Sequence, residues 1–204
     1  MKISVVCGYA PSLLNFRGPL LTTLINRGHT VVALAPSTDI SPDISQKLSL
    51  MGVRIKPFYL SRVGLNPFED FRSFLSLFRL LISDRQDYVY AYTVKPVIYT
   101  GLALRFCRVF NRNNTPLFAC HITGLGFPFS TNGSSRSIFR SLLKQLLLFL
   151  YRESLLASEV VFFQNPDDMY EFKVLGLLSN SAKIVRTWGS GVDLKAFPPT
   201  PLPS

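Results

Sequence analysis

Met1-Lys-Ile-Ser-Val-Val-Cys-Gly8 opens the chain with a short apolar run that ends at a glycine. A run of this length, bounded by a turn residue, is typical of a buried strand. Residues 17–26 are predicted to form a helix, with Pro19 in the first turn and Gly28 just past the end. The next apolar run, Val31–Ala35, predicts a second strand. The order strand, helix, strand is typical of a parallel α/β sheet.

The same alternation continues through most of the chain. Further strands are predicted at Val53–Phe58, Tyr88–Tyr92, Pro116–Cys120, Val160–Phe163 and Lys183–Arg186, and further helices at 42–51, 67–83, 97–109, 136–157 and 166–175. Seven short apolar strands separated by helices predict an α/β, Rossmann-like parallel sheet of about seven strands with helices on both faces. Residues 1–197 are predicted to form one domain. Residues 198–204 hold four prolines and predict an extended linker.

Composition limits the class of protein. The 204 residues suit one large domain, and 48% apolar with 17% charged residues excludes a disordered chain. The 22 Lys and Arg against 12 Asp and Glu give a net charge of +10, which predicts an anionic partner such as phosphate, acidic lipid or nucleic acid. The three cysteines form no C-x-x-C pair, so a disulfide framework and a cysteine zinc site are not expected.

In open parallel sheets, ligands bind beyond the carboxyl ends of the strands. The loop from Gly8 to Gly18 is not the G-x-G-x-x-G of a dinucleotide site, and Ala35-Pro-Ser37 supplies no acidic ribose anchor. The sequence also lacks G-x-x-x-x-G-K and H-E-x-x-H. These absences exclude a plain dehydrogenase, a P-loop nucleotide triphosphatase and an H-E-x-x-H metalloprotease.

Seven short motifs, in this order, resemble the N-terminal domain of family 4 glycosyltransferases. They are Asn15-Phe-Arg17, Arg62-x-Gly-Leu-Asn-Pro67, Lys95-Pro-x-x-Tyr-x-Gly101, Ile122-Thr-Gly-Leu-Gly-Phe127, Tyr151-Arg152, Gln164-Asn-Pro-Asp-Asp168 and Gly189-Ser-Gly-Val-Asp-Leu-x-x-Phe197. The resemblance covers essentially the whole chain. It is greatest to bacterial enzymes that extend undecaprenyl-diphosphate-linked sugars.

The resemblance implies one half of a two-domain GT-B enzyme, on the side that receives the acceptor. A sugar would pass with retention from a nucleotide sugar, expected to be a UDP-sugar, to a polyprenyl-diphosphate-linked saccharide, without a bound metal or another cofactor. A C-terminal domain, in cis or in trans, would hold most of the donor, so the isolated 204-residue half is expected to be inactive. The alternative is a non-catalytic subunit that presents the acceptor to a separate catalytic chain.

Site residues follow from loop position and from the resemblance. Predicted substrate-binding residues are Gly8, Arg17, Arg62, Asn66, Lys95, Thr123, Gly124 and Gly126, and predicted donor-side hinge residues are Asn165, Gly189, Ser190 and Gly191. His121 is predicted to follow the fifth strand at the cleft edge and is the candidate catalytic residue. Structural alternatives stay open: helix caps and turns for the asparagines and glycines, solvated surface charges for the cations, and a satisfied structural histidine.

Two helices combine basic and apolar residues. In 136–157, Arg136, Arg140 and Lys144 recur every four residues beside a leucine-rich run, and 67–83 carries Arg72 and Arg79 among phenylalanines. Such helices favour docking onto an anionic leaflet, with an ordinary core helix as the alternative. No apolar run is long enough to span a bilayer and no signal peptide is evident, so the prediction is a cytoplasmic protein, peripheral on the inner face of the plasma membrane. Its dispersed basic residues and lack of a recognition motif argue against a nucleic-acid partner.

Overall fold

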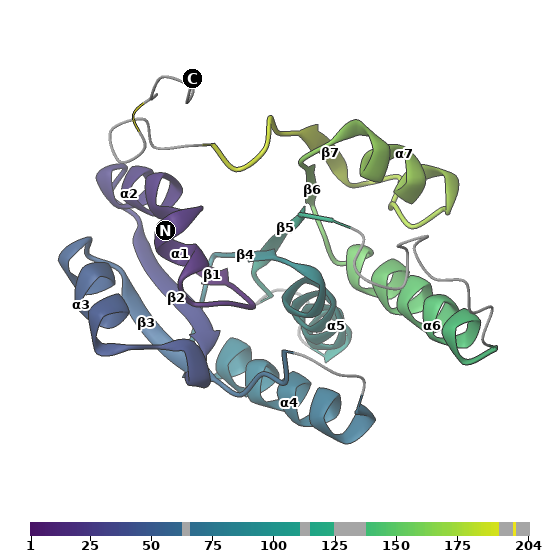
Figure 1. Ribbon diagram of the computed structural model, residues 1–204, viewed down its shortest axis with the longest axis horizontal. Coiled ribbons are helices and arrows are strands. Elements are labelled where there is room, and N and C mark those ends of the chain that lie inside the picture. The colour runs from purple at the N-terminus through teal and green to yellow at the C-terminus, as the bar shows by residue number, and fades with distance from the viewer. Residues whose placement is uncertain (63–65, 111–114, 125–137, 192–197, 199–204) are drawn as a thin grey trace, which may run out of the picture.

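The computed structural model describes residues 1–62, 66–110, 115–124, 138–191 and 198, with side chains from 141 onward in the helix that begins at 138. Within these residues, seven strands form one parallel sheet in the order β3-β2-β1-β4-β5-β6-β7 (Figure 1). The strands are β1 (Lys2–Val6), β2 (Thr30–Pro36), β3 (Arg54–Phe58), β4 (Tyr88–Tyr92), β5 (Leu117–Ile122), β6 (Val160–Phe163) and β7 (Lys183–Arg186). The predicted fold class is confirmed.

Helices cover both faces of this sheet. They are α1 (Ser12–Asn15), α2 (Gly18–Asn26), α3 (Pro42–Leu50), α4 (Pro67–Ser83), α5 (Val94–Phe110), α6 (Ile138–Leu155) and α7 (Pro166–Val174), with a 3₁₀ turn at Ser37–Asp39. Residues of α1, α2 and α3 share one buried cluster with β1 and β2, whereas α4, α5, α6 and α7 share a second cluster on the other face. The helices divide between the two faces in this way because the connections between parallel strands are right-handed.

Alternation along β1 explains why two cores form. Val5 and Cys7 belong to the cluster under α1 to α3, whereas Val6 belongs to the cluster under α4 to α7. Successive side chains of a strand point to opposite faces, so a central strand covered on both sides must be apolar throughout. The near-continuous apolar run at the start of the sequence therefore indicates a strand that is buried on both faces.

Two element boundaries differ from the sequence prediction in ways that matter for the site. Strand β5 continues to Ile122, so His121 lies inside the strand, paired in register with Tyr92 on one side and Phe162 on the other. The prediction that His121 follows the strand is therefore wrong. Helix α5 begins at Val94, three residues before the predicted start, because Pro96 is tolerated in a first turn where backbone N–H groups have no helical partner.

No helix among the described residues is long and apolar enough to cross a membrane.

Candidate ligand site at the carboxyl edge of the sheet

The direction in which successive strands are added to the sheet reverses between β1 and β4. From β1 the strands run outward to β2 and β3, and the chain then returns to place β4 on the other side of β1. Gly8 and Thr93 follow these two strands, and a Cβ built on Gly8 would lie 2.8 Å from the Thr93 hydroxyl oxygen. This reversal point is where open α/β sheets bind ligands. Gly8 is needed there because the two loops approach so closely.

Thr93 has a backbone conformation that β-branched residues rarely adopt. Its φ is +70°, and its buried hydroxyl oxygen has no hydrogen-bond partner within the described residues. A left-handed conformation strains a residue other than glycine by about 1–3 kcal/mol and is concentrated at binding sites. A buried hydroxyl without a partner is also uncommon. Both features mark the carboxyl end of β4 as a candidate ligand site.

We expect Gly8 and Thr93 to be energetically coupled. Gly8→Ala should lower the free energy of unfolding by about 1–3 kcal/mol, because the new Cβ overlaps the Thr93 hydroxyl. The same change in a Thr93→Gly background should cost less than about 1 kcal/mol, since the obstructing hydroxyl is gone and the positive φ suits glycine. Urea unfolding of the four proteins of this cycle measures the coupling. Additive effects would show that the two loops do not meet as described.

Arg17 lies at the same edge and is buried. It precedes α2, its side chain packs with its guanidinium carbon 4.7 Å from the centre of the Tyr92 ring, and only 5% of the residue is exposed. Its Nη2 is 3.3 Å from His121 Nδ1 and its Nη1 is 3.4 Å from the Phe16 carbonyl oxygen, whereas the buried Nε has no partner in the part of the chain that is described. Every one of these contacts is to a neutral group.

A buried guanidinium without a counter-ion is unusual. Within the described residues no carboxylate pairs with Arg17, although other cations do form ion pairs, such as Lys95 with Asp70 and Arg105 with Glu153. Removing a charge from water costs several kcal/mol unless an opposite charge or good hydrogen bonds offset it. The environment of Arg17 is therefore suited to an anionic ligand that would supply the missing charge and accept a hydrogen bond from Nε.

The contacts of His121 determine which of its ring nitrogens carries the hydrogen. A guanidinium can only donate, and the Tyr90 hydroxyl lies 2.7 Å from His121 Nδ1, so Nδ1 is the acceptor and Nε2 carries the hydrogen. Nε2 lies 3.3 Å from the Thr187 hydroxyl, which in turn donates to the Phe163 carbonyl oxygen. Burial, and secondly the charge of Arg17, lower the pKa of His121 to about 4. His121 is therefore neutral near pH 7 and leaves Arg17 as the cation of this cluster.

This lowered pKa predicts a specific loss of stability in mild acid. The unfolded chain binds a proton at His121 near pH 6.5 and the folded chain only near pH 4, so the stabilising effect of the neutral ring is present above pH 6.5 and is lost as the pH falls toward 4. Between pH 7.5 and 5 the free energy of unfolding should fall by roughly 2 kcal/mol on this account.

Urea unfolding at pH 7.5 and at pH 5 measures that loss. His121→Gln should remove most of the difference, whereas His29→Gln should keep it because the buried ring is still present. An equal pH dependence in wild type and His121→Gln would contradict the environment described for His121.

The other predicted substrate-binding residues fall into two groups. Arg62 reaches the carboxyl edge, where its guanidinium carbon lies 4.8 Å from the centre of the Tyr9 ring and Nη1 lies 3.6 Å from Asp39. Lys95 forms an ion pair with Asp70 at 2.6 Å, so both of these cations already have a carboxylate nearby, Lys95 at the shorter distance. The Asn66 side chain accepts a hydrogen bond from the Phe68 N–H and caps α4. A structural role accounts for Lys95 and Asn66 without a ligand.

The remaining predicted residues lie past β5 and around β7. Thr123 and Gly124 follow β5 and are half-buried, and Gly126 lies outside the described residues. Asn165 caps α7 by accepting a hydrogen bond from the Asp168 N–H at 2.7 Å. The Ser190 hydroxyl accepts from Gln164, and the turn that holds Ser190 has positive φ at Gly189 and Gly191. The cap and the turn explain these residues structurally, and their predicted hinge role stays a prediction.

Sequence reasoning missed the residues that surround Arg17. Tyr92 packs against the guanidinium, and Tyr90 and Thr187 contact His121, the hydrogen-bond partner of Arg17. The Ser12 hydroxyl lies 2.7 Å from the Tyr92 hydroxyl, and Thr93 lies beside Gly8 at the same edge. One signal was available, because Tyr88-Val-Tyr-Ala-Tyr92 alternates aromatic and small residues and so places its rings on one face of a strand. No comparable signal exists for Thr93, whose importance comes from its backbone angle.

Comparison with known proteins agrees with the resemblance found in the sequence motifs. No protein-family model matches the sequence. Among curated proteins, the chain is similar to the N,N'-diacetylbacillosaminyl-diphospho-undecaprenol alpha-1,3-N-acetylgalactosaminyltransferase of Campylobacter jejuni, with 24% identity over 199 residues. The match covers 98% of this chain and 49% of that protein, so the chain spans about half the length of this relative.

Among solved structures, this chain is similar in fold to about half of each of two longer proteins. A sucrose-phosphate synthase from Thermosynechococcus elongatus superposes with a TM-score of 0.61 at 9% identity, covering 96% of this chain and 49% of that one. The MurG structure from Acinetobacter baumannii gives a TM-score of 0.54 at 15% identity, covering 91% and 44%. The predicted resemblance is confirmed: the chain is similar in sequence to part of a bacterial transferase named for a diphospho-undecaprenol-linked sugar, and it has the fold of one half of a GT-B glycosyltransferase.

Proposed function

We propose that this chain is the acceptor-binding half of a retaining glycosyltransferase that moves a sugar from a nucleotide sugar to a polyprenyl-diphosphate-linked saccharide. The observation that carries the proposal is the buried Arg17, which has neutral neighbours and an unpartnered Nε at the carboxyl edge of the sheet. The name of the Campylobacter jejuni relative supports the same acceptor chemistry, since it describes a diphospho-undecaprenol-linked sugar.

In this proposal the acceptor diphosphate sits beside Arg17. A diphosphate oxygen would accept a hydrogen bond from Nε and balance the guanidinium charge. Both interactions would be stronger than at an exposed arginine, because only 5% of Arg17 is exposed to water. Gly8 would let the phosphate approach the backbone after β1, where a side chain would meet Thr93. Arg62, on the neighbouring loop, would add only part of its positive charge to the potential for an anionic acceptor, because Asp39 lies 3.6 Å from its Nη1.

His121 would act as a positioning residue. Both of its ring nitrogens already face protein groups, namely Tyr90 and Arg17 at Nδ1 and Thr187 at Nε2. Because the pKa of His121 is about 4, its ring is neutral near pH 7. The ring therefore neither competes with Arg17 for the anion as a second cation nor repels the Arg17 guanidinium. These contacts favour orientation of Arg17 over the catalytic role predicted for His121 from the sequence.

Catalysis would then depend on placing two substrates. The chain would orient the acceptor hydroxyl against a nucleotide sugar, a UDP-sugar in our proposal, held mainly by a second GT-B half in cis or in trans. Stabilisation of the leaving diphosphate would come mostly from that second half. We propose no resident metal and no further cofactor for this chemistry.

Binding and turnover by the purified chain test the proposal together. In calorimetric titrations, a short-chain polyprenyl-diphosphate-linked saccharide should bind, whereas the matching monophosphate should bind at least about tenfold more weakly, because one charged group is missing. UDP-sugars alone should show little binding, and the chain should give no sugar transfer. Equal binding of diphosphate and monophosphate would contradict the acceptor assignment, and robust transfer would contradict the assignment as half of an enzyme.

The non-catalytic subunit keeps the same acceptor site and differs in where transfer takes place. A transfer assay with the separate catalytic chain, alone and mixed with this chain, separates the two forms. Transfer to a soluble acceptor by the separate chain alone supports a non-catalytic presenting subunit, whereas transfer that appears only in the mixture supports two halves of one enzyme.

A further inference from the structure

The backbone between β3 and α4 is held by side chains of α4. The Tyr59 N–H donates to Ser76 Oγ at 2.8 Å, and the Ser61 N–H donates to Ser73 Oγ at 2.9 Å. Leu60, between them, is buried in the core cluster that α4 and α5 share. Two alternate N–H groups are therefore bonded to α4, and the residue between them is held in the core. We call residues 59–62 the β3–α4 segment.

Lys95 holds the same segment from α5. Its Nζ donates to the Ser61 carbonyl oxygen and to an Asp70 carboxylate oxygen, at 2.6 Å in each case. Lys95 is the second residue of α5, and Asp70 lies in the first turn of α4. The ammonium group therefore links the β3–α4 segment to the beginnings of two helices at the carboxyl edge of the sheet.

A second donor from α5 holds the Asp70 carboxylate. The Tyr99 hydroxyl, four residues after Lys95 and so on the same helix face, lies 2.8 Å from the same carboxylate oxygen. Burial, and secondly the neighbouring carboxylate, raise the pKa of Tyr99 well above its ordinary value, so the hydroxyl stays protonated and donates. The side chains of Lys95 and Asp70 are only 20% and 28% exposed, so water and salt screen this pair less than a surface pair.

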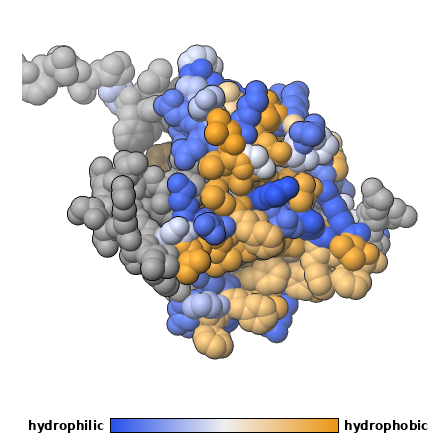
Figure 2. Space-filling view, turned by 90° about the vertical axis from the view of Figure 1, so that its right-hand side faces the viewer, coloured by the Kyte–Doolittle hydropathy of each residue, from blue (hydrophilic) through white to orange (hydrophobic). Residues whose placement is uncertain are grey.

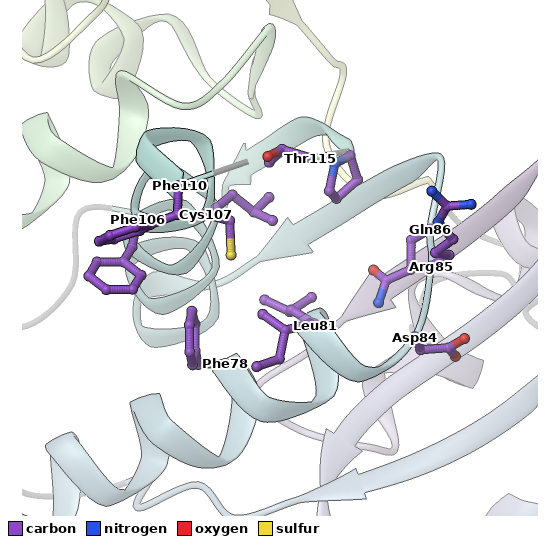
Figure 3. A pocket seen from close by; sticks show the side chains of 12 residues that line it. Phe78, Leu81, Asp84, Arg85, Gln86, Phe106, Cys107, Phe110 and Thr115 are labelled. Carbon is purple, nitrogen blue, oxygen red and sulfur yellow. The ribbon is translucent and has the colours of Figure 1, made fainter. Parts of the chain in front are cut away.

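Nearer their C-terminal ends, α4 and α5 meet through apolar side chains. The ring of Phe78 lies edge-on to that of Phe106, with ring centres 5.7 Å apart. A hollow of about 280 Å³ opens beside these rings, with Phe78, Leu81 and Phe106 in its wall (Figure 3). Figure 2 shows apolar side chains gathered over the side of the molecule where α4 and α6 lie. Apolar contacts are not directional, so the polar contacts at the beginnings of the two helices determine how the β3–α4 segment is placed.

Arg62 ends the segment at the loops that follow β1 and β2. Its guanidinium carbon lies 4.8 Å from the centre of the Tyr9 ring, and its Nη1 lies 3.6 Å from Asp39, which is longer than a hydrogen bond. The Arg62 side chain is 53% exposed, and exposed contacts of this kind orient a long side chain only weakly. The position of its guanidinium therefore depends on the backbone that carries it.

We propose that Lys95 is a positioning residue, which holds the Ser61 carbonyl and thereby places Arg62 against Tyr9 at the carboxyl edge. Lys95 would not touch the ligand, because its ammonium group already donates to Ser61 and Asp70, and leaving them would deprive Asp70 of its cation. The effect on a ligand rests on the proposed function, since Arg62 would meet an anionic acceptor. The placement of the segment can be measured without one.

Hydrogen exchange of the purified chain, followed by mass spectrometry without ligand, tests this placement. Lys95→Met should speed exchange of the amides of residues 59–62 at least about tenfold, because the bond to the Ser61 carbonyl is lost and the segment opens locally. Amides of β6 and α7 should stay within about twofold of wild type, since they do not depend on this local opening. Lys95→Arg should keep exchange of the segment within about threefold of wild type, because a guanidinium also donates to a carbonyl and a carboxylate.

The matched control is Lys47→Met, because Lys47 forms an exposed ion pair with Asp43 at 2.9 Å within α3. It should leave exchange of residues 59–62 unchanged. Lys95→Ala should give the same local increase as Lys95→Met and replaces it if methionine is not tolerated, since alanine suits a helix best. An equal increase in every part of the chain would show that Lys95 serves the whole fold and not the segment. No increase in residues 59–62 would overturn the proposal as well.

A double-mutant cycle with a short-chain polyprenyl-diphosphate-linked saccharide shows whether Lys95 acts through Arg62. Lys95→Met and Arg62→Gln should each weaken binding about three- to fivefold, and the double variant should bind within about twofold of Arg62→Gln alone. Losses that multiply would mean that Lys95 meets the ligand itself, contrary to the proposal. Absence of binding by the wild-type chain would contradict the proposed function, whereas the exchange measurement still decides the role of Lys95 in the segment.

Discussion

Replacing Arg17 by methionine is expected to weaken acceptor binding strongly while leaving the fold as stable as before, or more stable. Methionine keeps much of the apolar stem of Arg17 but removes a charge that is buried among neutral groups. The charge-assisted hydrogen bond from Nε, of about 1.5–3 kcal/mol, would be lost, so affinity for a diphosphate-linked saccharide should fall about 10- to 150-fold. The free energy of unfolding should stay the same or rise by about 1 kcal/mol.

Calorimetric titration and urea unfolding of Arg17→Met measure the two effects. Arg27→Met is the matched control, because Arg27 is an exposed arginine at the opposite end of α2. The control should bind the acceptor within about twofold of wild type. A loss of stability in Arg17→Met without a loss of binding would show that the guanidinium serves the fold and not a ligand.

Gly101→Ala is expected to cause a large loss of stability. Gly101 lies in α5 where that helix crosses α6, and a Cβ there would lie 2.5 Å from the Ser154 carbonyl oxygen and 2.7 Å from its Cα. Backbone atoms cannot turn aside as a flexible side chain would, so the helices must separate. Alanine gains about 1 kcal/mol of helix propensity, which does not offset the overlap. We expect a net loss of about 2–3 kcal/mol and a fall in Tm of roughly 5–10 °C.

Thermal unfolding monitored by circular dichroism measures this fall. Gly18→Ala is the control, since Gly18 is also helical but a Cβ there meets nothing within 4 Å. The control should have an unchanged or slightly higher Tm, because alanine restricts the unfolded chain. A Tm of Gly101→Ala equal to that of wild type would contradict the close packing of α5 on α6.

The sequence predicted the fold almost completely because its signals are local. Buried strands such as Val160–Phe163 are short apolar runs, and helices such as α4 begin at a capping asparagine followed by proline. The exceptions include helix α1 (Ser12–Asn15), which the sequence prediction did not contain, and strand β5 and helix α5, where the boundary depends on neighbours. His121 extends β5 because Tyr92 and Phe162 flank it in the sheet, and that pairing is not visible in the local sequence.

The site was only partly predictable, for a physical reason. Gly8 ends the first predicted strand and Arg17 belongs to the Asn15-Phe-Arg17 motif, so the sequence indicated both. Lys95 belongs to a motif as well, but Asp70, 25 positions away, balances its charge. The partners of Arg17 come from two different strands, β4 and β5, and from the neighbouring Phe16. Its lack of a counter-ion depends on packing and is not visible in any sequence spacing.

The most direct test of the account is a crystal structure of the chain with a soluble diphosphate-linked saccharide. We expect the diphosphate at the carboxyl edge of the sheet, with an oxygen within hydrogen-bonding distance of Arg17 Nε and the anion near the loop after Gly8. A diphosphate bound elsewhere, such as at the hollow between α4 and α5, with Arg17 still surrounded by neutral groups alone, would contradict the central claim.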